Sequence, residues 1–165
     1  MKKSMSILMV VALFFASAFT PKTQNVHEVE ADIVDLAVQT EFLSTLVAAV
    51  KAGELVDVLK GDGPFTVFAP VNSAFSQPVL DLYGSLSSDA KSQVLTYHVV
   101  SGANVRSNAI PSGNIATVQG QGFTITGTAI NDAGSDVKKN IILTDFQCSN
   151  GVVHAIDGVL LPSFN

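Results

Sequence analysis

The sequence predicts an α+β domain, in which a largely antiparallel sheet or sandwich has helices packed against it. Three observations lead to this fold class. Apolar residues at helical spacing gather in the first half of the chain, alternating segments gather after residue 114, and one strand lies between the two groups. Segregated runs of this kind favour an α+β domain over an alternating, parallel α/β arrangement.

The N-terminal segment is predicted to be an export signal. Lys2 and Lys3 precede an apolar run from Met5 to Phe15, and Ala16-Ser17-Ala18 fits a small-x-small cleavage site. This order is typical of a secretory signal peptide of bacterial type, which we assign to residues 1–18. A transmembrane anchor is the alternative, but the run is shorter than the ~20 apolar residues that a bilayer requires.

The rest of the chain is predicted to form one domain. Residues 19–30 are polar and aperiodic, which predicts a flexible tail, and the domain is assigned to residues 31–163. The formal charge of −5 becomes −7 when Lys2 and Lys3 are removed, and Arg106 is the single arginine. This acidic balance argues against nucleic acid or anionic lipid as a partner.

Three helices are predicted before the central strand. Asp32 is placed to cap a helix that begins at Ile33. Thr40 is placed to cap a second helix that Gly53 ends, and one buried face is predicted for it, formed by Phe42, Leu46, Ala49 and Val50. A short third helix follows, which Gly61 stops and which carries Leu55, Val56 and Leu59.

The stretch from Gly63 to Phe75 is the predicted centre of the fold. Phe65 to Ala69 alternates with apolar groups on both faces, so this strand is expected to lie between two layers. Pro70 is expected to end the strand, and Asn72 to cap a short helix that carries Ala74 and Phe75. We interpret the stretch as structural, because it holds no convincing acid, base or nucleophile.

The next segments turn from helical to β patterns. Short helix and turn are predicted from Pro78 to Leu86, and Ser87 or Ser88 is placed to cap a further helix. That helix is expected to turn Ala90, Val94 and Leu95 toward the core. β-Branched residues then favour a strand within Thr96 to Val100.

Five strands are predicted in the last third of the chain from alternation and turn residues: Ile115 to Val118, Phe123 to Thr126, Thr128 to Asn131, Ile141 to Phe146 and Val152 to Leu161. Asn150-Gly151 suits the positive backbone angles of a tight hairpin turn. The segment from Asp132 to Lys139 is predicted to be a solvated polar turn. A calcium site with Asp132 and Asp136 is the weaker alternative, because the ligand spacing of a calcium loop is missing.

No specific catalytic or metal-binding pattern occurs in the sequence. His27, His98 and His154 lack the mutual spacing of metal ligands, and Cys148 has no second cysteine beside it. Walker, G-x-S-x-G and G-x-G-x-x-G patterns are also missing. We therefore assign no catalytic, cofactor-binding or metal residue and expect no enzyme, although sequence alone leaves open a triad assembled in space.

The remaining titratable groups have structural interpretations. His98, at a helix-to-strand junction, and His154, in the middle of a strand, are expected to make structural hydrogen bonds. Cys148 is expected to be a buried, inert thiol, with an intermolecular disulfide as the alternative.

Three motifs, in order, resemble the fasciclin domain. The first is Gly63 to Phe75, which carries Thr66, Pro70, Asn72 and Phe75 at the positions of the family's first box. The second is the Tyr97-His98 pair, within Leu95 to Val100. The third is Asn150 to Pro162, with His154 and Asp157. Asp32-Ile33-Val34-Asp35 resembles the usual start of the domain, so the likeness covers about Ala31 to Pro162.

The resemblance implies a compact wedge of mainly antiparallel strands flanked by N-terminal and central helices. It also implies an extracellular interaction module, usually without catalysis. In animal relatives an Asp-Ile pair just before the last box is implicated in integrin binding, and the matching positions here are Asp145 and Phe146. No N-x-S/T sequon and no C-terminal hydrophobic tail occur in this sequence.

These observations predict a secreted, non-catalytic adhesion or matrix-interaction protein, extracellular, periplasmic or at the cell surface. A cell-surface or matrix protein, or a polysaccharide, is the expected partner, and no membrane span is expected after signal cleavage. A secreted binding protein for a polysaccharide or small apolar ligand is the main alternative. A hydrolase built on His98 or His154 is a third. Thr66 and Asn72 are expected to make structural hydrogen bonds, with the Tyr97-His98 junction as a candidate partner, and the core is expected to contain Phe65, Val67, Phe68 and Phe75.

Overall fold

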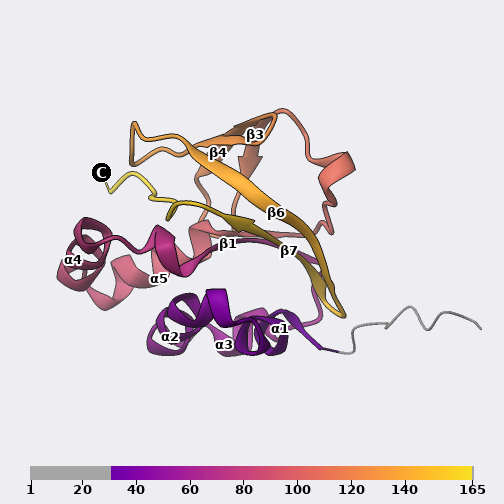
Figure 1. Ribbon diagram of the computed structural model, residues 1–165, viewed down its shortest axis with the longest axis horizontal. Helices are drawn as coiled ribbons and strands as arrows, with labels where there is room; N and C mark the ends of the chain where they lie inside the picture. Colours follow the sequence, from indigo (N-terminus) through magenta and orange to yellow (C-terminus); the bar gives the residue numbers. More distant parts are fainter. Residues whose placement is uncertain (1–30, 165) are drawn as a thin grey trace, which may run out of the picture.

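The computed structural model describes residues 31–164, which fold into one seven-stranded sheet with helices packed on it (Figure 1). The strand order is β2-β1-β7-β6-β5-β4-β3. Only the neighbouring strands β1 and β7 are parallel, and all other pairs are antiparallel, so the predicted α+β class is confirmed. The strands are β1 (Phe65–Pro70), β2 (Val99–Ser101), β3 (Gly113–Ala116), β4 (Gly122–Thr126), β5 (Ala129–Asn131), β6 (Lys139–Cys148) and β7 (Gly151–Ile156).

The α-helices precede β1 or lie between β1 and β2. They are α1 (Ile33–Gln39), α2 (Ser44–Ala52), α3 (Val56–Leu59), α4 (Gln77–Ser85) and α5 (Ser88–Tyr97), with 3-10 turns η1 (Glu41–Leu43), η2 (Asn72–Ala74) and η3 (Ser107–Ala109). Two predicted caps are confirmed: the Asp32 carboxylate accepts from the Asp35 N–H, and the Ser87 hydroxyl accepts from the Ala90 N–H. The predicted signal peptide and tail lie outside the described residues.

Strands β1 and β7 form the middle of the fold. Every residue of β7 is buried, and β1 is buried from Thr66 to Pro70. The start of β1 passes close to the turn before β7. A Cβ on Gly151 would lie 2.1 Å from the Phe65 carbonyl oxygen, and one on Gly63, whose φ is +63°, would lie 2.1 Å from that of Asn150. Glycine is therefore required at both positions.

The two faces of β1 and β7 bury separate hydrophobic cores. Val67 and Ala69 face the first core, which α1, α2, α3 and α5 cover. Phe68 faces the second core, which contains Phe123 of β4 and Ile130 of β5. Because distant strands share this second core, the sheet must curl over it, and Figure 1 shows β3 and β4 on the side opposite α1, α2 and α3. The predicted position of the Phe65–Ala69 strand between two layers is confirmed.

The start of α2 differs from the prediction. The chain first makes the 3-10 turn η1, which changes the phase of the helix, so Leu43 is buried and Phe42 is 37% exposed. Thr40 does not cap this helix, because its hydroxyl donates to the Leu36 carbonyl of the preceding helix at 2.7 Å. Asn72 caps α2 instead: its side-chain oxygen accepts from the Thr45 N–H at 3.0 Å.

The last third of the chain differs in its turns and strand ends. Neither Asn150 nor Gly151 has a positive φ, so that expectation for the hairpin is wrong. Strand β7 ends at Ile156, well before the predicted Leu161, and β3 starts and ends two residues earlier than predicted. The predicted solvated turn ends in a buried ion pair, in which the Lys139 ammonium lies 2.7 Å from the Asp132 carboxylate.

Within residues 31–164 no single helix is long and apolar enough to cross a membrane. The helices Ile33–Gln39 and Glu41–Ala52 meet that test only as a pair, by length and composition, and the chain bends by 109° between them.

Candidate functional site

The Tyr97-His98 junction is closed by hydrogen bonds and offers no free base. The Leu160 N–H donates to His98 Nε2 at 2.9 Å, which requires the proton to sit on Nδ1, and Nδ1 lies 2.7 Å from the Val94 carbonyl oxygen. The ring is 2% exposed. Burial, with the charge of Lys139 as a smaller cause, lowers the pKa of His98 to about 4, although the Val94 hydrogen bond acts in the opposite direction. His98 is therefore neutral at physiological pH.

Tyr97 joins the helix α5 to the far end of the sheet. Its hydroxyl donates to the Gly122 carbonyl at 2.8 Å and accepts from the Ala133 N–H at 3.1 Å. Burial raises the pKa of Tyr97, and the Asp132 charge adds to this effect. The phenol therefore stays protonated and holds the start of β4 and the end of β5 against the second core.

His154 and Thr66 together fix the segment after β2. The His154 Nε2–H donates to the Val105 carbonyl at 2.7 Å, while the Thr66 hydroxyl accepts from the Val105 N–H at 2.9 Å and donates to the Ala103 carbonyl at 2.8 Å. Neither Thr66 nor Asn72 bonds the Tyr97-His98 junction, so that expectation is wrong. Asn72 bonds helix α2 through Thr45, Glu41 and Ser44.

The other motif residues also lie in packing or turn positions. Asp157 accepts from the Asn140 N–H at 2.6 Å and from the Asn140 side chain at 2.9 Å, which closes the end of β7 onto β6. Pro70 is buried at the end of β1, and Phe75 is half-buried against the first core. The first box, the junction and the last box thus meet around β1 and β7, and the polar side chains described above are engaged in hydrogen bonds within the fold.

The Asp145-Phe146 pair lies on an irregular part of β6, where the register with β7 shifts between Leu143 and Phe146. Asp145 is exposed and has a φ of +64°. Its N–H donates to His154 Nδ1 at 3.3 Å, and its carboxylate accepts from both the N–H and the hydroxyl of Ser107. These bonds to Ser107 lower the pKa of Asp145.

The two members of this pair face different surroundings. Phe146 is half-buried, packs against the first core and has its ring centroid 6.2 Å from that of Phe42. Ile142 and Leu143, just before Asp145, are 47% and 45% exposed. The exposed residues of this irregular segment therefore include a fixed carboxylate and two apolar side chains, and we name Ile142, Leu143, Asp145 and the bonded Ser107 the β6 bulge surface.

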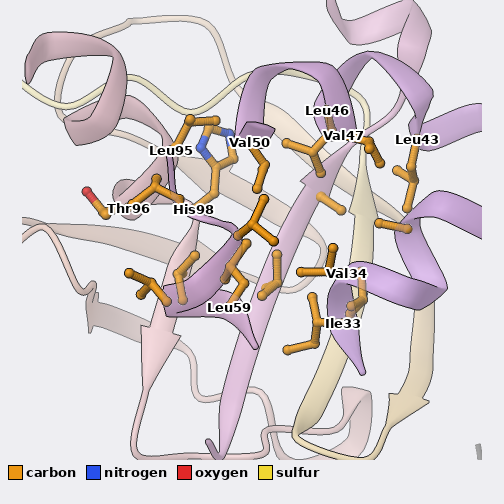
Figure 2. A pocket seen from close by; sticks show the side chains of 18 of the residues that line it. Ile33, Val34, Leu43, Leu46, Val47, Val50, Leu59, Leu95, Thr96 and His98 are labelled. Carbon is orange, nitrogen blue, oxygen red and sulfur yellow. The ribbon is translucent and has the colours of Figure 1, made fainter. Parts of the chain in front are cut away.

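A second feature is an apolar pocket between the helices α1, α2 and α3 and the sheet face of β1 and β7 (Figure 2). Figure 2 shows Val34 of α1 and Leu46 and Val50 of α2 pointing into it, with Leu95 and His98 at one end. The space open to the centres of water-sized atoms is about 40 Å³. One water needs about 10–15 Å³ by this measure, so the pocket exceeds a packing defect.

The lining of the pocket contains few polar residues. Thr96 and His98 are its two uncharged polar residues, and the Thr96 hydroxyl already donates to the Ser92 carbonyl. Lys51 is the single charged residue of the lining. Sequence reasoning missed this pocket, because its walls come from segments that are far apart in the chain.

The described part of the chain contains no group of three His, Cys, Asp or Glu side chains placed to hold a metal ion. Cys148 is 4% exposed, and burial raises the pKa of its thiol to about 11, with the Asp32 charge as a second cause. Thiolate chemistry at neutral pH is therefore unfavourable at this position.

Comparison with known proteins gives a consistent family. Residues 41–162 match the family described as the Fasciclin domain. The chain is 40% identical over 152 residues to Protein sll1483 of Synechocystis sp., which covers 87% of this chain and 82% of that protein. It is 35% identical over 144 residues to the cell surface glycolipoprotein MPB83 of Mycobacterium bovis, which covers 79% of this chain and 60% of that protein.

A solved structure shares the fold. The FAS1 domain pair of the insect cell adhesion molecule fasciclin I matches with a TM-score of 0.65 at 18% identity, over 81% of this chain and 51% of that chain. Sequence identity this low shows the fold alone. Sequence motifs, family match and fold agree, and the chain belongs to the fasciclin domain family.

Proposed function

We propose that this chain is an extracellular, non-catalytic interaction module that attaches to a cell-surface or matrix partner through the β6 bulge surface. Membership of the fasciclin family supports an adhesion-type role. The names of MPB83 and fasciclin I place those relatives at the cell surface and in cell adhesion. The signal peptide predicted from the sequence agrees with export.

The observation that carries the proposal is the way Asp145 is held. Its carboxylate is exposed, but Ser107 binds both carboxylate oxygens and His154 accepts from its N–H. A side chain fixed before binding loses less conformational entropy in a complex than a mobile one. The lowered pKa keeps the carboxylate charged at neutral and mildly acidic pH.

The neighbours of Asp145 favour a protein partner. Ile142 and Leu143 are large exposed apolar side chains on the same strand. Exposed apolar side chains close in the chain to an exposed charged group are compatible with a protein–protein contact surface. The surface fits a partner that presents a basic side chain among apolar groups, and several copies on one cell would multiply a weak single contact.

The test compares Asp145→Asn with Asp136→Asn. Asparagine tolerates a positive φ, so the first variant removes charge with little change of backbone. Asp136, an exposed aspartate in the turn before β6, is the matched control. Beads that carry the full chain are incubated with envelope or matrix from the producing organism, and retention is measured against protein density.

We expect the wild type and Asp136→Asn to bind alike and Asp145→Asn to bind more than about tenfold more weakly, as for a central charged contact. No retention by the wild type would contradict the adhesion role. Equal retention by all three proteins would contradict the β6 bulge surface while leaving adhesion in place.

A further inference from the structure

We propose that the apolar pocket beneath α1, α2 and α3 binds one aliphatic chain with an anionic head group, a monomeric fatty acid in chemical class, with the head group at Lys51. This inference goes beyond the adhesion function and involves different residues. It narrows the alternative raised by the sequence, a binding protein for a polysaccharide or a small apolar ligand, to one ligand class and one site.

The interior of the pocket favours a hydrocarbon chain as its ligand. Its walls are aliphatic side chains, including Val34, Leu46, Val50 and Val153. Both nitrogens of His98 and the hydroxyl of Thr96 are engaged in hydrogen bonds with the backbone. A sugar inside would lose its hydrogen bonds with water and find none in return, whereas a hydrocarbon loses nothing.

The rim of the pocket selects the head group. Three lining residues are exposed and come from different segments: Lys51 from α2, Val58 from α3 and Val118 from the turn after β3. Val58 and Val118 are 45% and 39% exposed, so the opening is apolar apart from one ammonium group. A fatty acid whose methyl end enters the pocket first would therefore leave its carboxylate head group beside Lys51.

Lys51 is available for this contact. The ion pairs among the described residues are made by Lys60 and Lys139, not by Lys51. Glu54 and Asp57 follow it in the sequence, but neither lines the pocket. The Lys51 ammonium, as the single charged group of an apolar lining, favours a carboxylate over a cationic head group.

The primary experiment titrates the full chain with hexanoate, octanoate and decanoate below their micelle concentrations, at low ionic strength, by calorimetry and thermal shift. Each added pair of buried methylenes should tighten binding about fifteenfold, from ~0.8 kcal/mol per methylene, until the pocket is full. The chain length at which tightening stops measures the depth of the pocket. No saturable binding of decanoate by the wild type would overturn the proposal.

Pocket-filling variants test the site. Ala37→Phe places a ring in the lining, and Ala48→Phe makes the same change at an exposed position of α2 outside the lining. Ala37→Phe should lose decanoate binding, and Ala48→Phe should keep it. If Ala37→Phe does not fold, Val47→Phe, also in the lining, takes its place. A folded lining variant that binds as tightly as the wild type would refute the assigned site.

Charge variants test the head group. Lys51→Glu should bind decanoate at least about twofold more weakly and decyltrimethylammonium more tightly, as for an exposed ion pair. Lys138 is an exposed lysine outside the lining, so Lys138→Glu should change the affinity for neither ligand. An unchanged preference in Lys51→Glu would show that the head-group assignment is wrong.

Two further measurements distinguish ligand binding in the pocket from binding at the β6 bulge surface and from binding to a membrane surface. Asp145→Asn should bind decanoate like the wild type, because the β6 bulge surface shares no residue with the pocket. Binding to phosphatidylglycerol vesicles without binding of decanoate would replace the monomeric ligand by a membrane surface and contradict the proposal.

Discussion

Acid should destabilise this domain mainly through one buried ring, His98. The ring is neutral in the folded state because its Nε2 accepts from the Leu160 N–H and burial disfavours its charge. Protonation would break that hydrogen bond and place a cation in the core. The unfolded chain imposes neither restriction, so below pH 6.5 it takes up a proton that the folded state refuses.

The size of the effect follows from the two pKa values, 6.5 for the free side chain and about 4 for His98 in the fold. The unfolded state binds more protons between these values, so the stability is complete above pH 6.5 and falls as the pH drops toward 4. From pH 7.5 to pH 5 the free energy of unfolding should fall by about 2 kcal/mol. Below pH 4 the loss from this residue levels off near 3 kcal/mol.

Urea unfolding of the wild type and His98→Gln at several pH values measures this contribution. The variant should be less stable at pH 7.5 by about 1–3 kcal/mol, because a buried hydrogen bond is lost or imperfect. The free energy of unfolding of the variant should lack the part of its pH dependence that His98 causes in the wild type. The difference between the two proteins should therefore shrink by about 2 kcal/mol between pH 7.5 and pH 5.

Subtracting the free energy of unfolding of His98→Gln from that of the wild type removes the contributions of the other titrating groups, because both proteins share them. A difference that stays constant within about 0.5 kcal/mol over this range, well inside the expected change, would refute the reasoning. It would mean that the folded state takes up a proton on the ring as readily as the unfolded chain does, so that the Leu160 N–H contact with Nε2 would not disfavour the charged ring.

Three further predictions concern the core. In urea unfolding, Phe68→Ala should lower the free energy of unfolding by about 3–5 kcal/mol. The control Val137→Ala changes a side chain that is 68% exposed and should alter it by no more than about 0.5 kcal/mol. A loss under about 1 kcal/mol for Phe68→Ala would place that side chain outside the core. Lys139→Met leaves Asp132 buried without its counter-charge and should cost about 3–5 kcal/mol; a near-neutral result would contradict the buried pair. Cys148 should react with iodoacetamide at pH 8 only after unfolding, and equal rates in buffer and urea would contradict its burial.

Features that depend on neighbours in the sequence could be predicted. The alternation in Phe65 to Ala69 identified a strand with two buried faces, and the caps Asp32 and Ser87 act on the N–H group three residues later. The three fasciclin motifs identified the family, since each is a continuous stretch. Their contacts with one another could not be derived, because these depend on the path of the whole chain.

Features that depend on distant partners were missed. Asn72 looks like the cap of the turn that follows it, yet it caps a helix that begins 28 residues earlier. Asp132 and Lys139 lie in a polar segment, and only the fold shows that this segment buries their charges. Phe42 was misplaced because a 3-10 turn changes the helical phase, which apolar spacing alone does not reveal.

The candidate sites differ in the same way. Asp145 was found through its motif, but its restraint by Ser107, 38 residues away, was not. The pocket left no signal at all, because its apolar lining residues look like ordinary core positions in the sequence. Its one cue, Lys51, resembles any surface lysine on a helix.

The position of β7 also determines when the chain can fold. β7 is the last strand to be synthesised, yet it lies between β1 and β6 and supplies residues to both cores. Asn150, just before it, bonds the N–H of Ile33 and the carbonyls of Leu59 and Gly61, across 117, 91 and 89 residues. We expect a chain cut after Asn150 to show no amides protected from hydrogen exchange, since the middle of its sheet is missing. The helices made first must wait for β7, so this domain matures only after the last strand of its sheet has been made.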